Sequence, residues 1–105
     1  MLKVYGSELC PDCRECEKNF DAHGIEYSYI DINESMKNLK EFLKLRDTLP
    51  VFEVCKERGS IGIPAIVSED GSVTLDWEGI LTDMGLPVVF REERPLLCSI
   101  DGKNC

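Results

Sequence analysis

Short apolar runs alternate with longer amphipathic stretches along this chain. The runs are rich in β-branched and aromatic residues, and several alternate apolar with polar positions, as half-buried strands do. We predict four strands, at residues 2–5, 25–32, 61–67 and 73–77. Residues 69–72 carry a hairpin turn signal, so the last two strands should pair directly.

The amphipathic stretches predict helices. The first should begin at Pro11, because proline suits the first helical position, and should end before Gly24. Asn33 is placed to cap a second helix that has its own apolar face. Two short helices complete the prediction, at residues 51–58 and from Thr82-Asp83 onward, after a break at Gly79.

This order of elements, β-α-β-α-β-β-α, predicts an α/β fold. A strand–helix–strand unit followed by a helix and a hairpin forms a four-stranded mixed sheet with helices on both faces. We expect one domain over residues 1–86. Residues 87–105 lack a regular pattern, and we expect a tail packed loosely on that domain.

Charge and hydropathy limit the classes of partner that this protein can bind. The chain of 105 residues carries 20 acidic and 12 basic side chains, a formal net charge of −8, which argues against nucleic acid or an anionic membrane as partner. No apolar run approaches the roughly 20 residues of a membrane helix, and residues 1–6 do not resemble a secretion signal. We expect a monomeric cytoplasmic protein.

The chemistry centres on Cys10-Pro11-Asp12-Cys13. This C-x-x-C motif directly follows the first strand and opens the first helix, where the helix N-terminus favours a thiolate. Cys10 should attack a disulfide and Cys13, one turn later, should resolve the mixed disulfide. Pro11 stiffens the turn, and we place it with the substrate-binding residues. A zinc half-site is the alternative interpretation.

Charged residues around the motif modify this expectation. Asp12 should oppose ionisation of Cys10 and Arg14 should partly compensate, so we predict a less acidic thiol than the helix terminus alone would give. Further along the helix, Glu15 and Glu17 interleave with lysine in the pattern of a solvated face. His23, in the last turn, is explained by the helix dipole.

Two further cysteines are expected to pack in the interior. Cys16 falls where the first helix should meet the sheet, and Cys55 lies in a short helix; free cysteine is often buried. The sharper alternative for Cys16 is a metal or iron–sulfur ligand set together with Cys10 and Cys13.

The predicted tail carries Cys98 and Cys105 on either side of an Asp-Gly turn. Three interpretations stay open at this stage. The two thiols are free, or they form a redox pair that relays electrons to the C-x-x-C motif or senses oxidation, or they complete a four-thiolate metal site with Cys10 and Cys13. The metal interpretation gives the alternative function, a metal or iron–sulfur module.

The Ile63-Pro64 step is the second candidate element. Proline in a strand is confined to edges, strand starts and bulges. A cis bond would turn the backbone of Ile63 outward to pair with an extended substrate, whereas a trans bond would mark a plain edge strand.

These motifs together resemble the glutaredoxins, which have a thioredoxin-like fold. The resemblance covers residues 2–85 and rests on the opening strand, C-P-D-C at 10–13, G-I-E-Y-S-Y-I-D-I at 24–32 and G-I-P-A-I-V at 62–67. It implies a disulfide oxidoreductase with no bound cofactor and with glutathione as co-substrate. Cys10 is then the nucleophile, Cys13 the resolving thiol and Pro64 the cis-proline.

The resemblance also implies a glutathione site. Ile63 would offer its backbone to the cysteine part of glutathione, and Gly79, Thr82 and Asp83 fall where the family binds the γ-glutamyl end. Asp12 replaces the aromatic residue that often stands between the cysteines, and cations usual near the motif are absent. Since glutathione carries two carboxylates, a protein disulfide is the other candidate substrate.

Overall fold

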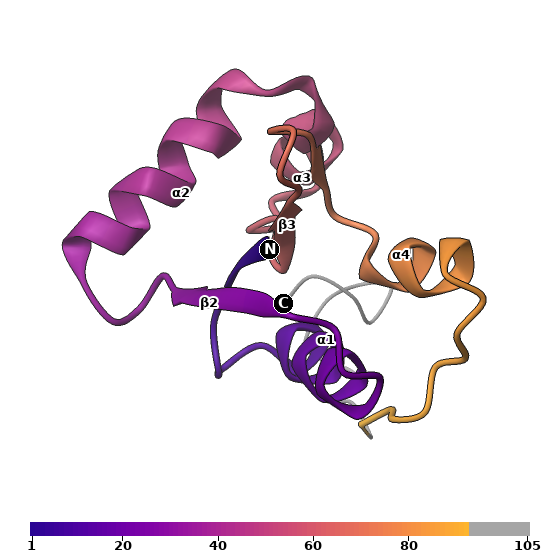
Figure 1. The fold of residues 1–105 in the computed structure, drawn as a ribbon. Coiled ribbons are helices and arrows are strands. Elements are labelled where there is room, and N and C mark those ends of the chain that lie inside the picture. The colour runs from indigo at the N-terminus through magenta and orange to yellow at the C-terminus, as the bar shows by residue number, and fades with distance from the viewer. Residues whose placement is uncertain (93–105) are drawn as a thin grey trace.

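Four strands form one mixed sheet in the order β2-β1-β3-β4 (Figure 1). The computed structural model describes residues 1–92. The strands are β1 (Leu2–Gly6), β2 (Tyr27–Asp31), β3 (Ala65–Val67) and β4 (Val73–Thr74). β1 runs parallel to β2 and antiparallel to β3, and β3 and β4 form the predicted hairpin. The predicted α/β class with a mixed sheet is confirmed.

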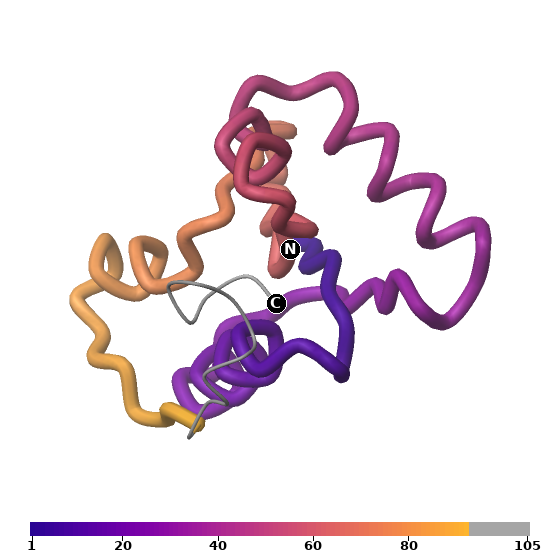
Figure 2. Tube along the Cα trace, turned by 180° about the vertical axis from the view of Figure 1, so that it is seen from behind, coloured from indigo at the N-terminus to yellow at the C-terminus, as the bar shows by residue number. Residues whose placement is uncertain are grey.

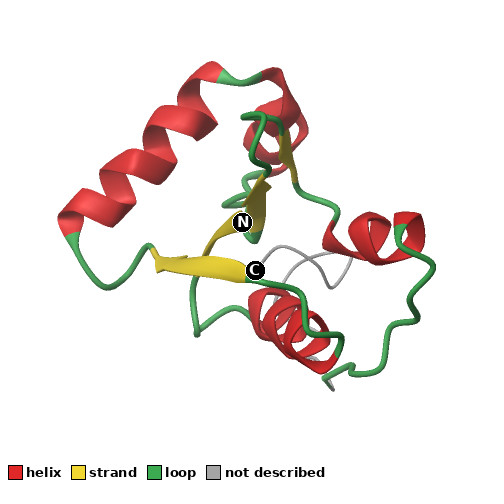
Figure 3. Ribbon diagram, in the orientation of Figure 1, coloured by secondary structure: helices red, strands yellow, loops and turns green. Residues whose placement is uncertain are grey.

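Helices cover both faces of this sheet (Figures 1 and 3). They are α1 (Pro11–Ala22), α2 (Met36–Thr48), the 3₁₀ turn η1 (Pro50–Phe52), α3 (Glu53–Arg58) and α4 (Trp77–Asp83). None of those in the described part of the chain is long and apolar enough to cross a bilayer.

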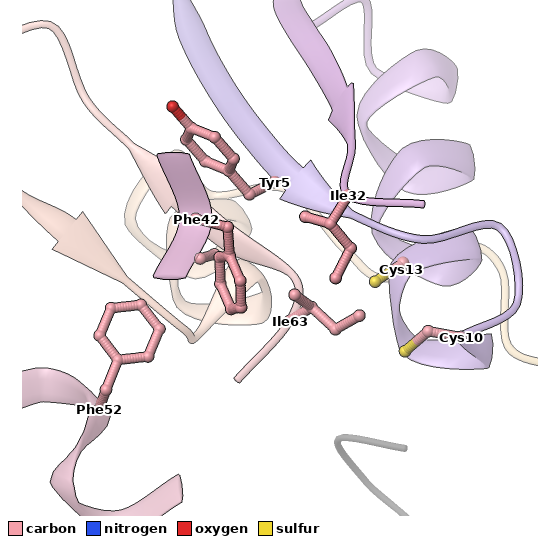
Figure 4. Packing of buried hydrophobic residues seen from close by; sticks show 8 residues of the cluster. Tyr5, Cys10, Cys13, Ile32, Phe42, Phe52 and Ile63 are labelled. Atoms are coloured by element: carbon pink, nitrogen blue, oxygen red, sulfur yellow. The ribbon is translucent and has the colours of Figure 1, made fainter. Parts of the chain in front are cut away.

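The strand alternation splits the core into two layers. Tyr5 and Ala65 face a cluster that includes Phe42 of α2 and Phe52, whose rings meet edge to face with centroids 5.9 Å apart (Figure 4). Their strand neighbours Val4 and Ile66 point to the opposite face and pack with side chains of α1 and α4, namely Cys16, Phe20, Trp77 and Leu81. Successive strand residues face opposite sides, so one short sheet supports both layers.

The last third of the fold differs from the prediction. The strand predicted at 61–67 is confined to Ala65–Val67, because residues 61–64 bend through Gly62 (φ +95°) and a cis Ile63–Pro64 bond. The strand predicted at 73–77 ends at Thr74. α4 begins at Trp77 rather than Thr82, since the Asp76 carboxylate caps it by accepting the Gly79 N–H at 3.0 Å.

The caps of the two long helices also refine the prediction. α1 is followed by Gly24 at φ +69°, as expected for a helix stop. α2 is capped by Ser35, whose Oγ accepts the Asn38 N–H at 3.1 Å, and the predicted Asn33 cap was wrong. Asn33 instead contacts the hydroxyl of Ser7 through its side-chain oxygen.

Residues 86–92, which we call the strap, follow α4 and run alongside α1 (Figure 2). Asn19 of α1 accepts the Val89 N–H at 2.7 Å and donates to the Phe90 carbonyl at 3.0 Å. His23 Nε2 donates to the Pro87 carbonyl at 2.7 Å. Loose packing was therefore wrong for residues 87–92, whereas the division into 1–86 and 87–105 stays a prediction.

Candidate functional site

Cys10 occupies the N-cap of α1, with Pro11 as the first helical residue. The loop from β1 delivers it there: the Cys10 N–H donates to the Ser7 carbonyl, and the Cys10 carbonyl accepts the Arg14 N–H, both at 3.1 Å. The predicted arrangement of strand, motif and helix is confirmed.

The surroundings of Cys10 favour its thiolate. A side-chain hydrogen bond from Cys13 is the largest cause, and the backbone N–H groups of Cys13 and Asp12 also donate to the sulfur. Burial and the charge of Asp12 act in the opposite direction, and the balance lowers the pKa of Cys10 to about 7. Asp12 thus opposes ionisation, as the sequence predicts.

Cys13 behaves in the opposite way. It is fully buried, and its pKa is strongly raised by its hydrogen bond to Cys10, by burial and by the negative charge on Cys10. The backbone N–H of Ser7 is the group that acts against this rise. In the reduced pair the charge therefore rests on Cys10 and the proton on Cys13.

Arg14 stabilises the Cys10 thiolate less than the sequence predicts. Its guanidinium holds the carboxylate of Glu92 in the strap through two hydrogen bonds, at 2.7 and 2.8 Å, and also donates to the Glu8 carbonyl. Because the positive charge of Arg14 is shared with a carboxylate, the Cys10 thiolate is stabilised mainly by Cys13 and then by the backbone N–H groups of the helix N-terminus.

The segment 61–64 lies beside the two thiols. The Ile63–Pro64 bond is cis, which decides between the two alternatives that the sequence leaves open. Ile63 is 1% exposed and its side chain lies next to Cys10 and Cys13 (Figure 4). Gly62 is required because a Cβ there would lie 2.9 Å from the Phe52 ring.

Two hollows flank the motif. One, of about 150 Å³, is mostly apolar and is lined by Ser7, Leu9, Cys10, Ile32, Asn33, Ile61 and Ile63. The other, of about 390 Å³, contains three acidic residues and is lined by Asp12, Val51, Thr74, Leu75, Asp76, Trp77 and Glu78. Neither lining includes a lysine or an arginine, although Arg91 pairs with Glu78 beside the second hollow.

Asp12 links the motif to α4. Its carboxylate is buried and accepts a hydrogen bond from Trp77 Nε1 at 3.0 Å. The N-terminus of α4, at Asp76 and Trp77, therefore lies beside the cysteine pair. The sequence prediction missed this because it read residues 73–77 as a strand; the cap-forming Asp76 ahead of Ile80 and Leu81 was the available signal.

The predicted γ-glutamyl residues are placed differently. Gly79 lies in the first turn of α4, whereas Thr82 and Asp83 are in its last turn. Asp83 lines a separate hollow with Leu2, at the start of β1, while Cys10 follows the end of that strand. The structure brings together five of the predicted site residues: Cys10, Pro11, Cys13, Ile63 and Pro64. Asp83 lies apart from them.

The other cysteines do not share the site. Cys16 is fully buried with Phe20 and Trp77 in the core layer opposite the one that holds Cys10 and Cys13, and Cys55 is also buried, as predicted for both. Among residues 1–92 no three side chains of His, Cys, Asp or Glu are grouped to hold a metal ion. Cys98 and Cys105 lie outside the described residues.

Glu15 corrects another expectation. The solvated face predicted for α1 fails here, because Glu15 is fully buried beneath the strap. Its carboxylate accepts the Glu92 N–H at 2.9 Å and faces Arg91 at 3.5 Å. Local sequence held no signal for this burial, since the partners lie about 77 residues away.

A cysteine pair at a helix N-terminus, beside a cis-proline and on this four-stranded sheet, defines a protein of the thioredoxin-like fold with a redox-type motif. The glutaredoxin family model matches residues 2–68, and the chain belongs to the glutaredoxin family.

Similar proteins were found both by sequence and by fold. The chain is 37% identical over 73 residues to an uncharacterized protein of Haemophilus influenzae, covering 70% of this chain and 85% of that one. It also resembles an epsilon-class glutathione S-transferase of the housefly, Musca domestica, at a TM-score of 0.50 and 19% identity over 80% of this chain. The chain spans 34% of that transferase, so the likeness concerns the fold alone.

Proposed function

We propose that this protein is a thiol–disulfide oxidoreductase in which Cys10 is the nucleophile and Cys13 the resolving thiol. The observation that carries the proposal is the opposite tuning of the pair: Cys10 accepts three hydrogen bonds at a helix N-terminus, whereas Cys13 is buried and keeps its proton. Only a thiolate attacks a disulfide, so this asymmetry supports Cys10 as the sulfur that attacks first.

The reaction has two exchange steps. The Cys10 thiolate attacks one sulfur of a substrate disulfide, forms a mixed disulfide and releases the first thiol. Cys13 then attacks the Cys10 sulfur, gives its proton to the departing thiolate and closes the Cys10–Cys13 disulfide. Two electrons pass from the dithiol to the substrate, and an external thiol such as glutathione restores the reduced pair.

Two substrate classes fit the site, glutathione mixed disulfides and protein disulfides. Membership of the glutaredoxin family supports glutathione, and the resemblance implies that the backbone of Ile63 would hold its cysteine part and that Gly79, Thr82 and Asp83 would lie at the γ-glutamyl end. The hollows beside Cys10 favour a polypeptide, since one is apolar and the other is lined by acidic groups that repel the carboxylates of glutathione. We expect a monomer acting in the cytoplasm, where thiols stay reduced.

The test is turnover of a glutathione mixed disulfide, coupled to glutathione and its reductase, with a protein disulfide assayed in parallel. Cys10→Ser should lose activity by on the order of 10³-fold or more, because the hydroxyl does not ionise near neutral pH. Cys55→Ser, a buried thiol outside the site, is the matched control and should keep the wild-type rate. A wild type inactive on both substrates, or an active Cys10→Ser, would refute the proposal.

A further inference from the structure

Among the side-chain nitrogen and oxygen atoms of residues 1–92, one buried atom has no hydrogen-bond partner, the hydroxyl oxygen of Tyr29. Tyr29 lies on β2, directly opposite Val4 of β1, and its ring packs at the edge of the core beneath α1. A buried hydroxyl without a partner costs free energy, so its retention calls for a physical reason.

The hydroxyl of Tyr29 and the thiol of Cys13 both lie next to Gly6. A Cβ built on Gly6 would lie 2.7 Å from Tyr29 Oη and 3.0 Å from Cys13 Sγ. Because Gly6 carries no side chain, both polar groups can lie close to its backbone. No other residue type would allow both groups to occupy their positions, because a Cβ at 2.7 Å is closer than van der Waals contact permits.

Cys13 needs a hydrogen-bond donor next to its sulfur when it reacts. To resolve the mixed disulfide it must give up its proton, which burial opposes, and the nearby charge of Asp12 opposes it further. The Ser7 N–H already donates to the sulfur. A thiolate accepts more than one hydrogen bond, and a neutral thiol is a weak acceptor, so a second donor acts only once the thiolate forms.

We propose that Tyr29 is a positioning residue for the resolving step, its hydroxyl donating a hydrogen bond to Cys13 Sγ as the thiolate develops. The inference rests on the proposed function. No proton leaves Tyr29: the Cys13 proton passes to the departing substrate thiolate, the Cys10–Cys13 bond forms and the Cys10–substrate bond breaks.

The surroundings of Tyr29 keep its hydroxyl protonated, so that it can donate a hydrogen bond. Burial raises the pKa of Tyr29 most, and the negative groups that face it raise it further; these are Cys13 and Glu17 of α1, Glu8 of the preceding loop and Asp31 of β2. Burial and the charge of Asp12 oppose a thiolate on Cys13. The hydroxyl hydrogen of Tyr29 is a positive end that offsets them.

The test separates the two exchange steps in a single turnover. Full-length protein carrying Cys98→Ser and Cys105→Ser is mixed with 5,5′-dithiobis(2-nitrobenzoate), and the two released thionitrobenzoate groups report attack by Cys10 and then resolution by Cys13. In Tyr29→Phe we expect the first phase within about twofold of the parent and the second slowed roughly tenfold, the effect of one hydrogen bond to a charged group. The pH midpoint of the second phase should rise.

Tyr27→Phe is the matched control. It removes a hydroxyl from the same strand and the same face, but one whose partner is Asp21 at 2.8 Å, and it should leave both phases unchanged. Tyr29→Phe should unfold at the same temperature as the parent or higher, since it removes an unpaired polar group. Absence of the first phase in the parent would refute the proposed function. An unchanged second phase in Tyr29→Phe, or equal slowing of both phases, would overturn the role of Tyr29 alone.

Discussion

The two sides of α1 use buried polar atoms for different purposes. On one side, Cys10 and Cys13 lie against the 61–64 loop, and their hydrogen bonds divide one negative charge unequally between two sulfurs. On the other side Asp12, Glu15 and Asn19, spaced three and four residues apart, are buried against α4 and the strap. The first arrangement prepares a reaction, and the second holds the C-terminal part of the described chain in place.

Burial of a polar group therefore does not by itself identify a reactive site. Asn19 is fully buried with both ends of its amide paired, so it has nothing left to offer a ligand. Cys10 also has partners, but they stabilise its charged form and leave the sulfur at a hollow. The distinguishing feature is which protonation state the partners favour.

The largest effect on the structural side should come from Asn19→Ala. Its amide pairs with backbone groups of Glu15, Val89 and Phe90, and truncation leaves several of them buried and unpaired. We expect a loss of about 2–4 kcal/mol in the free energy of unfolding, measured by urea denaturation. The rate of Cys10 alkylation should stay within about twofold, since the thiol's own partners are untouched.

Asn38→Ala is the control for this substitution. Asn38 is half-buried, and its side chain donates one hydrogen bond, to the Asp31 carbonyl at 3.0 Å. We expect a cost of at most about 1 kcal/mol. If Asn19→Ala costs no more than Asn38→Ala, the strap is not held as described.

A smaller effect should follow from Asp12→Asn, the position where the two sides of α1 meet. The asparagine oxygen can still accept from Trp77 Nε1, but the charge that raises the pKa of Cys10 is gone. The pKa of Cys10 should fall below about 7, and alkylation at pH 6 should speed up by about two- to fivefold. Asp21→Asn, at the far end of α1, should leave the pKa unchanged; an equal shift in both variants would show a general charge effect.

Much of this arrangement can be read from the sequence. The first strand, Pro11 and the C-x-x-C spacing are local signals, and they suffice to place Cys10 at a helix N-terminus. The final helix was misplaced because Val73 to Trp77 alternates like a strand, and tertiary contacts of Trp77 overrode that pattern. The burial of Glu15 and the placement of Tyr29 and Cys13 on either side of Gly6 depend on segments distant in the chain, which no local pattern records.

The most direct test of the central claim, that Cys10 is a poised thiolate, is the pH dependence of its alkylation in the reduced full-length protein, followed on the Cys10 peptide by mass spectrometry. The thiolate is the reactive form, so the rate should rise with pH and reach half its maximum near pH 7. A midpoint at the ordinary thiol value of about 8.5 would contradict the account, because the helix terminus and Cys13 would then not be stabilising the charge.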